Sequence, residues 1–231
     1  MVIQDERTLQ LIGEKNFASL QSKTILIFGL GGVGGYVAEA LARVGIKHFI
    51  LVDHDTVALS NLNRQIIALH STLGQKKIEA MKKRILDIRS DAKIECYDMF
   101  YLPEYLDKDK LFYGVDYIVD AVDTITAKID IVLEAQKRGI PLISAMGTGN
   151  KLRPEFLEVT DIYRTEMCPL CKVMRRELKK RNVAFLKVVY SKEQPQKVGS
   201  RTPASMIFVP ASAGLLTASE VVLDFLALDK K

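Results

Sequence analysis

Cysteine is scarce in this sequence and tryptophan is absent. The 231 residues include three cysteines, an odd number that does not build a disulfide framework, so we expect a protein of the reducing cytoplasm. Glycine and proline number only 14 and 7, which excludes a collagen-like or a low-complexity chain. With 48% hydrophobic and 26% charged residues, the chain can bury a sizeable core. The composition is that of an ordinary globular protein.

Long uninterrupted apolar runs are also missing. The most hydrophobic windows are residues 24–30, which have the length of a strand, and residues 207–228, which Pro210, Glu220 and Asp224 interrupt. Because the first fifteen residues contain charges throughout, we expect no signal peptide. Because the two windows are short or interrupted, we also expect no stable membrane span. The charge excess is small as well. The 33 Lys and Arg against 28 Asp and Glu give +5, which permits a polyanionic partner without requiring one.

Short β-branched runs alternate with helical patterns in the first 150 residues. This alternation predicts an α/β fold with a doubly wound, mainly parallel, Rossmann-like sheet and right-handed crossovers. From residue 151 the alternation gives way to a polar stretch punctuated by proline. The expected strands are residues 24–28, 48–52, 94–97, 118–119, 141–144 and 186–191, and the expected helices are residues 36–44, 76–88, 129–137, 172–181 and 213–228.

A glycine-rich turn follows the first of these strands. Gly29, Gly31 and Gly34 form the pattern G-x-G-x-x-G, in which missing side chains let backbone amides and a helix N-terminus approach phosphates. Asp53 ends the next strand, where an acid suits ribose hydroxyls. The alternative is that the glycines serve only tight helix packing. The pair predicts a nucleotide site but does not distinguish ATP from NAD.

Polar and cationic residues follow the second strand in the segments SNLNRQ and LGQKK. Asn61, Arg64 and Lys77 belong to segments that begin beside the glycine turn. Two cations and an amide suit a triphosphate and its departing pyrophosphate, whereas hydride transfer has no use for them. The alternative is that these residues are solvated charges on helices.

The motifs GLGGVGGYVAEAL, VDHDTVALSNLNRQ, GQKK and DAVDT, in this order and spacing, resemble the ubiquitin-activating-type (ThiF/MoeB/HesA) superfamily. Its members use ATP to adenylate a carboxylate. The segments ERTLQLIGEK, ISAMGTGNKL, CPLCKVMRRELKKR and VPASAGLLTASEVV resemble one branch, the tRNA threonylcarbamoyladenosine dehydratases. The resemblance covers nearly the whole chain.

The resemblance implies roles for particular residues. It places Asp123, the second acid of DAVD, on Mg²⁺ bound with ATP, which leaves Asp120 as a structural acid. Arg7 in the N-terminal helix matches an arginine that related homodimers supply to the partner subunit's ATP site. The ATP site itself would comprise Gly29, Gly31, Gly32, Gly34, Asp53, Asp55, Asn61, Arg64 and Lys77.

The resemblance also implies a reaction and a domain organisation. The carboxylate of threonylcarbamoyladenosine, next to the anticodon of a tRNA, would be adenylated and then attacked by its own carbamoyl group, with net loss of water. We expect ATP and Mg²⁺ as cofactors, a homodimer, and tRNA as partner, and the family also allows a sulfur-transfer protein. Residues 1–150 would form the ATP-binding adenylation domain, and residues 151–231 a substrate-binding and dimerisation portion packed on the same core.

A basic helix is expected between residues 172 and 181. It holds six cations and one acid, and spacings of three and four gather most of the cations on one face. Phosphate contacts to tRNA are the natural use of such a face, and a solvated charged surface is the alternative. The six cations are Lys172, Arg175, Arg176, Lys179, Lys180 and Arg181.

Cys168 and Cys171 form a C-x-x-C pair whose role the sequence leaves open. A structural zinc site needs four ligands, and Cys96 is the only other cysteine. Sulfur or persulfide chemistry, a thiol in a substrate loop, and simple packing all remain. A redox C-x-x-C would open a helix after a thioredoxin-type strand, a context that the sequence does not predict here.

Three other functions remain open from the sequence. The first is adenylation of the C-terminal glycine of a ubiquitin-like sulfur carrier, which a missing second C-x-x-C and the basic helix disfavour. The second is an NAD-dependent oxidoreductase, in which Arg64, Lys77 and Asp123 would have no role. The third is an inactive tRNA-binding or scaffold protein that keeps the fold.

Overall fold

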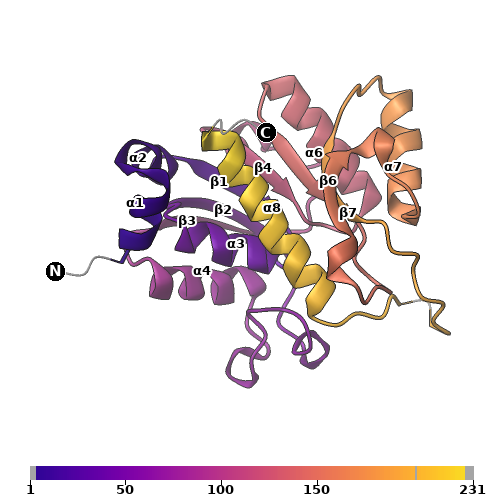
Figure 1. Cartoon of the computed structure of the whole chain (residues 1–231), viewed down its shortest axis with the longest axis horizontal. Helices are drawn as coiled ribbons and strands as arrows, with labels where there is room; N and C mark the ends of the chain where they lie inside the picture. Colours follow the sequence, from indigo (N-terminus) through magenta and orange to yellow (C-terminus); the bar gives the residue numbers. More distant parts are fainter. Residues whose placement is uncertain (1–3, 201, 227–231) are drawn as a thin grey trace.

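A seven-stranded sheet forms the centre of the computed structural model, which describes residues 4–200 and 202–226 (Figure 1). The strands follow the order β3-β2-β1-β4-β5-β7-β6, and every neighbouring pair is parallel except β6 and β7. The strands are β1 (Thr24–Phe28), β2 (His48–Asp53), β3 (Lys93–Asp98), β4 (Tyr117–Asp120), β5 (Leu142–Ala145), β6 (Leu157–Asp161) and β7 (Lys187–Ser191).

The central strands are apolar along their whole length because helices cover both faces of a doubly wound sheet. In β1, residues 25–28 are all buried, and this strand pairs with β2 on one side and β4 on the other. The predicted doubly wound fold is therefore confirmed. The edge strand β6 was not predicted: it is half-buried along its length and runs antiparallel to β7.

Helices α3, α4 and α8 cover one face of the sheet, and α6 and α7 pack on the other (Figure 1). The short helix α5 packs on the same face as α6. The α-helices are α1 (Glu6–Ile12), α2 (Glu14–Gln21), α3 (Gly34–Arg43), α4 (Lys77–Ile88), α5 (Lys108–Leu111), α6 (Ile125–Arg138), α7 (Pro169–Lys180) and α8 (Phe208–Leu226). Short 3₁₀ turns are η1 (Leu59–Asn61), η2 (His70–Thr72), η3 (Pro154–Phe156) and η4 (Ile162–Arg164).

Helix α8 begins earlier than the sequence predicts. It starts at Phe208 rather than at residue 213, and Pro210 lies in its first turn, where the missing N–H has no helical partner to lose. Its predicted end at residue 228 lies outside the described residues. Gly214 lets α8 approach α3 closely, since a Cβ there would lie 2.5 Å from the Val33 carbonyl oxygen.

By length and composition, α8 is the one helix of the described chain that could cross a membrane. In this fold, however, Ala213, Ala218 and Val221 belong to the main hydrophobic core. Its acids are paired with a strand, because Lys187 Nζ lies 2.5 Å from Asp224 Oδ1 and 3.5 Å from Glu220 Oε2. These contacts are those of a core helix.

The connections from β1 and β4 leave the sheet on opposite faces, toward α3 and α6 respectively. At such a switch point the loops separate and leave a crevice beyond the carboxyl ends of the strands, which is where ligands bind in open α/β sheets. The topology therefore places the glycine turn after β1 opposite residues 121–124 after β4.

Candidate active site

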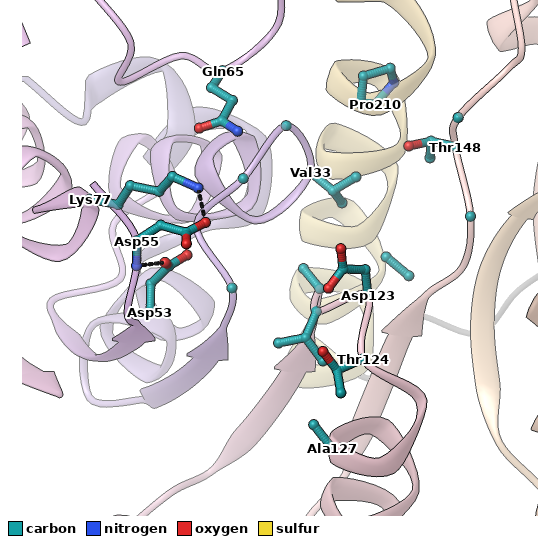
Figure 2. Close-up of a pocket in the computed structure, with 18 of the residues that line it drawn as sticks. Val33, Asp53, Asp55, Gln65, Lys77, Asp123, Thr124, Ala127, Thr148 and Pro210 are labelled. Atoms are coloured by element: carbon teal, nitrogen blue, oxygen red, sulfur yellow. Dashed lines mark hydrogen bonds and ion pairs between the residues drawn. The ribbon is translucent and has the colours of Figure 1, made fainter. Parts of the chain in front are cut away.

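A cavity of about 480 Å³ lies at the switch point. It is bounded by the loops that follow β1, β2, β3, β4 and β5 and by the start of α8. In Figure 2, Asp53, Asp55 and Lys77 lie on one side of the cavity, and Asp123 and Thr124 lie on the other. The lining includes these residues expected from the sequence: Gly29, Gly31, Gly32, Asp53, Asp55, Asn61, Arg64, Lys77 and Asp123.

The glycines of the turn have two different tasks. Gly29 has a φ of +86°, and a Cβ on Gly34 would lie 1.8 Å from the Gly29 carbonyl oxygen, so these two glycines are required by the path of the chain. A Cβ on Gly31 would meet only Gln65 Nε2, at 3.8 Å, and therefore would project into the cavity. Gly34 itself does not line the cavity.

Asp53 ties the glycine turn to the end of β2. Its Oδ2 accepts the Leu30 N–H at 2.6 Å, and its Oδ1 accepts the Asp55 N–H at 2.8 Å. Each carboxylate oxygen has a further lone pair for a ligand hydroxyl. The same side chain can thus hold the loop and bind a ribose.

Lys77 is held at the first turn of α4 by an ion pair. Its Nζ lies 2.6 Å from Asp55 Oδ2, and the lysine side chain is only 6% exposed. Partial burial alone would raise the pKa of Asp55, but the hydrogen bond and charge of Lys77 outweigh this effect and keep the pKa below its ordinary value. Asp55 therefore stays ionised and keeps the ammonium group in place beside the cavity.

The SNLNRQ segment turns at η1 and directs Asn61, Arg64 and Gln65 toward the cavity. Arg64 Nη1 donates to the Ser60 carbonyl oxygen at 2.9 Å, which anchors the guanidinium. Asn61 Oδ1 accepts the Ala58 N–H at 3.0 Å, so the amide nitrogen of Asn61 can donate a hydrogen bond to a ligand. Gln65 is buried and its Oε1 lacks a hydrogen-bond partner among the described residues. A buried amide of this kind indicates that a polar ligand belongs here.

Asp123 has an exposed carboxylate that no described residue engages by a hydrogen bond or an ion pair. It projects into the cavity from the loop after β4 (Figure 2). Asp120, three residues earlier, is by contrast fully buried and paired with Lys128. The expectation that Asp120 is a structural acid is confirmed, and Asp123 is the acid that a cation bound with phosphates could reach.

The comparison with models of protein families shows which family this chain belongs to. The family model described as "ThiF family" matches residues 4–222. The chain belongs to the ThiF family. This confirms the superfamily that the sequence motifs indicated.

Close relatives within the ThiF family carry the name tRNA threonylcarbamoyladenosine dehydratase. The protein of that name from Bacillus subtilis (strain 168) is 40% identical over 98% of this chain and 96% of its own length. The one from Escherichia coli (strain K12) is 36% identical over 74% of this chain and 64% of its own. The branch indicated by the second half of the sequence is thus confirmed.

Solved structures of the Escherichia coli enzyme share the fold over nearly the whole chain. One in complex with AMP and one in complex with ATP each have a TM-score of 0.90, with 30% identity over 97% of this chain and 94% of theirs. The cavity described above therefore lies in a fold whose relative binds adenine nucleotides.

The ThiF-family cavity also has lining residues that sequence reasoning missed. Met99, Phe100 and Tyr101 follow β3, and the rule that ligands bind at carboxyl ends of strands could have found them. Thr202, Pro203 and Ser205 come from the long connection between β7 and α8, and no sequence signal indicated them.

Hydrogen bonds of two asparagines hold this β7–α8 connection beside the cavity. Asn150, at φ +59°, accepts the Gln196 N–H with its carbonyl oxygen and donates its own N–H to Ala204 O, both at 2.7 Å. Asn63 Nδ2 donates to the Ser205 carbonyl oxygen at 2.8 Å. The connection therefore forms one wall of the site.

Two groups of expected residues lie outside the cavity. Arg7 is exposed on α1 and does not line it. The basic helix corresponds to α7, whose residue Leu170 lines the cavity while the rest of the helix leads away. Of its cations, Arg175 is held by the Thr165 carbonyl oxygen at 2.8 Å, and three surround Glu177 at 3.0–3.1 Å: Arg176, Lys180 and Arg181.

Proposed function

We propose that this chain is an ATP-dependent tRNA threonylcarbamoyladenosine dehydratase. The observation that carries the proposal is a cavity that combines the glycine turn, two phosphate-directed cations and an uncommitted acid, in a chain 40% identical to a dehydratase over 98% of its length. Such a cavity suits a nucleoside triphosphate at the glycine turn and a carboxylate substrate at its open side.

The described residues suit transfer of an adenylyl group to a carboxylate. The substrate carboxylate attacks the α-phosphorus, and charge develops on the departing pyrophosphate. Arg64 and Lys77 stabilise that charge, because both are anchored beside the glycine turn before the reaction begins. Gln65 Nε2, which lies beside Gly31 at the cavity, can donate to a phosphate oxygen. The adenylate is then attacked by the substrate's own carbamoyl group, and AMP leaves.

Asp123 would hold Mg²⁺ in this site. Mg²⁺ is bound by one or two carboxylates together with phosphate oxygens and water, and when bound it neutralises phosphate charge. The free carboxylate of Asp123 fits this requirement, while the Asp55 carboxylate is engaged by Lys77.

Helix α7 would contact the tRNA. It begins at the cavity wall and extends for about 18 Å at 1.5 Å per residue. When the modified tRNA nucleotide lies in the cavity, the neighbouring tRNA backbone would therefore run along the helix. Lys172 and Lys179 are exposed and form no ion pair within residues 4–200 and 202–226, so they can neutralise phosphates without first breaking a contact.

Activation of a sulfur carrier is the less favoured reading. The relatives named adenylyltransferase and sulfurtransferase match a smaller share of the chain, as with the Dictyostelium discoideum protein at 34% identity over 58% of it. With three cysteines in all, the chain also lacks a second C-x-x-C pair. In the proposed reaction the substrate's own carbamoyl group is the nucleophile, so the reaction itself does not require a sulfur-transfer partner.

The proposal extends to the assembly and its location. The enzyme acts as a homodimer in the cytoplasm, where its tRNA substrate is found, and the exposed Arg7 of each subunit reaches the partner's nucleotide site. An arginine supplied in trans stabilises phosphate charge in other phosphoryl-transfer enzymes. Residues 1–150 supply the ATP site and residues 151–231 the substrate surface.

The direct test is nucleoside mass spectrometry of tRNA that carries threonylcarbamoyladenosine, incubated with the protein and MgATP. We expect the modified nucleoside to lose one water, with release of AMP and pyrophosphate. Asp123→Asn should abolish this loss, whereas Asp91→Asn, the same change on the surface away from the cavity, should not. ATP-dependent adenylation of a protein carboxylate without any change in the tRNA would contradict the proposal.

A further inference from the structure

Cys168 and Cys171 lie at the start of α7, which the sequence alone did not predict. Cys168 is the N-cap residue, Pro169 is the first helical residue, and Cys171 lies in the first turn. Residues three apart in a helical turn face each other. The C-x-x-C pair therefore does open a helix, the position in which one cysteine of such a pair is activated and the other stays close to it.

Both cysteines are buried in a hydrophobic cluster, with 4% of Cys168 and none of Cys171 exposed. Polar groups nevertheless converge on the Cys168 sulfur. The Cys171 thiol, the backbone N–H groups of Cys171 and Gly147, and the charge of Lys151 all favour the ionised form of this sulfur and so lower its pKa. Lys151 is itself 3% exposed, with its Nζ donating to the Ser191 carbonyl oxygen at 2.8 Å.

These contacts shift the pKa values of the two thiols in opposite directions. The hydrogen bond from Cys171 outweighs burial and, with the backbone donors and Lys151, lowers the pKa of Cys168 to about 5. The same hydrogen bond, together with burial, raises the pKa of Cys171. A cysteine that serves only packing does not need the charge of a buried ammonium group. One thiolate beside one protonated thiol is the arrangement of a dithiol redox pair.

The pair adjoins the nucleotide cavity through Gly147. A Cβ on Gly147 would lie 3.9 Å from both Cys168 Sγ and Leu170 Cβ, and Gly147 and Leu170 line the cavity. The wall at this point is thus a bare stretch of backbone that lies against the Cys168 sulfur, and its Gly147 N–H helps to lower the pKa of Cys168.

We propose that Cys168 and Cys171 form a reversible oxidation site for a peroxide, and that conversion of the dithiol to a disulfide weakens nucleotide binding by releasing the Gly147 backbone.

The chemistry balances with hydrogen peroxide as the oxidant. The Cys168 thiolate attacks one peroxide oxygen, the O–O bond breaks, and Cys168 becomes a sulfenic acid while hydroxide leaves and takes up a proton to form water. The Cys171 sulfur then attacks the Cys168 sulfur, the S–O bond breaks, and a second water forms with the thiol proton. Two thiols and one peroxide thus give one disulfide and two waters, and a dithiol reductant reverses the change.

Loss of the thiolate explains the expected effect on the cavity. A charged acceptor holds an N–H donor more strongly than a neutral one does, so a disulfide sulfur retains the Gly147 N–H less well. Because Gly147 belongs to the cavity wall, its release leaves the bound nucleotide in contact with a less rigid wall. We expect the dissociation constant for ATP to rise roughly three- to tenfold, as for the loss of one hydrogen bond.

The first measurement is a thiol count on the wild-type protein, by alkylation and mass spectrometry before and after hydrogen peroxide. We expect a disulfide that joins Cys168 to Cys171, removed again by dithiothreitol, with Cys96 still alkylated. Cys96 is a built-in control, because burial raises its pKa to about 11. Cys96→Ser should behave as the wild type does. Absence of this disulfide, or a disulfide that involves Cys96, would overturn the proposal.

The second measurement is ATP binding by calorimetry to the reduced and the oxidised wild-type protein, which requires no variant that might fail to fold. Weaker binding to the oxidised form, restored on reduction, supports the proposal. Equal binding to both forms overturns it. Because ATP binding is read without tRNA, either result is independent of whether the protein dehydrates threonylcarbamoyladenosine.

Discussion

Lys128 Nζ lies 2.9 Å from Asp120 Oδ2, and neither side chain is exposed to solvent. The ammonium group also donates to Ser144 Oγ at 3.1 Å and to the Ala145 carbonyl oxygen at 2.8 Å, while Asp120 Oδ1 accepts the Val122 N–H at 3.2 Å. This ion pair thus joins the ends of β4 and β5 to α6. The loop that carries Asp123 begins at the residue after Asp120.

Lys128→Met should destabilise the protein because it leaves a buried carboxylate without its cation. Breaking one side of a buried ion pair costs about 3–5 kcal/mol. We expect this decrease in the free energy of unfolding, measured by urea denaturation. The double variant Asp120→Asn/Lys128→Met removes both charges and should recover part of it. A single variant as stable as the wild type would show that the pair does not hold this region together.

Arg64→Ala should slow the adenylation step with little change in folding. Arg64 lies beside the glycine turn, and in the proposed reaction pyrophosphate leaves toward it, so turnover should fall by roughly 10²–10³-fold, as when one preorganised donor is removed. AMP release by chromatography measures this step. Arg43→Ala, an exposed arginine on α3, is the matched control and should retain activity. Retained turnover in a folded Arg64→Ala protein would show that Arg64 does not take part in adenylation.

The Asp55–Lys77 ion pair predicts a pH dependence in acid. Because the pKa of Asp55 is lowered from 3.8 in the folded state, its stabilisation is complete above that value and is lost as the pH falls through the lower, folded pKa. With half of the Asp55 side chain exposed, the effect should stay under about 1 kcal/mol. Urea unfolding of wild type and Asp55→Asn should differ at neutral pH and converge in acid. A constant difference would contradict the pairing.

Lys172 and Lys179 predict how tRNA affinity depends on salt. The double variant Lys172→Ala/Lys179→Ala should weaken tRNA binding and reduce the salt slope by about two, since each lysine releases roughly one counterion. ATP affinity should not change. The same double change at Lys82 and Lys83 on α4 serves as the control. An unchanged salt slope would show that tRNA does not use α7.

Mixing of inactive variants tests whether Arg7 acts across subunits. Arg7→Ala and Asp123→Ala should each lack activity as homodimers. A mixed dimer has one intact site, because the Asp123→Ala subunit still offers Arg7 to its partner. Random exchange should therefore restore about a quarter of wild-type activity. If the mixture remains as inactive as its components, Arg7 does not act in trans.

Much of the fold was predictable because buried parallel strands are apolar along their length. The runs TILIF and HFILV mark β1 and β2, and glycine and acid residues mark their ends. The strand β6 was missed because LEVTD lies at an edge, where half-buried positions give no continuous apolar signal. The start of α8 was placed late because Pro210 resembles a helix breaker, although a first turn tolerates it.

The site was predictable where a residue type matches its ligand chemistry. Arg64 and Lys77 were predicted because phosphates require cations, and Asp123 because the family resemblance implies an acid on Mg²⁺ there; all three line the cavity. Thr202 and Pro203 were not, since their place depends on hydrogen bonds of Asn150 to a distant segment, which no local pattern records. The sequence likewise does not predict which lysines and arginines of α7 are available to phosphates, because that depends on whether Glu177 or Thr165 contacts them. For Glu177, hydrogen bonds from Lys180 and then Arg181 lower the pKa to about 2.

The pairing of β5 with β7 has a consequence for any shortened form of the protein. Three residues of β5 align with β7, and this contact alone makes β5 an interior strand on that side. A chain that ended at residue 150 would leave unpaired the backbone groups of β5 that face β7, together with the Met146 N–H, which now donates to the Val189 carbonyl oxygen. Such edges recruit other strands. The ATP-binding half would therefore tend to aggregate when expressed by itself, and its solubility depends on residues that come later in the chain.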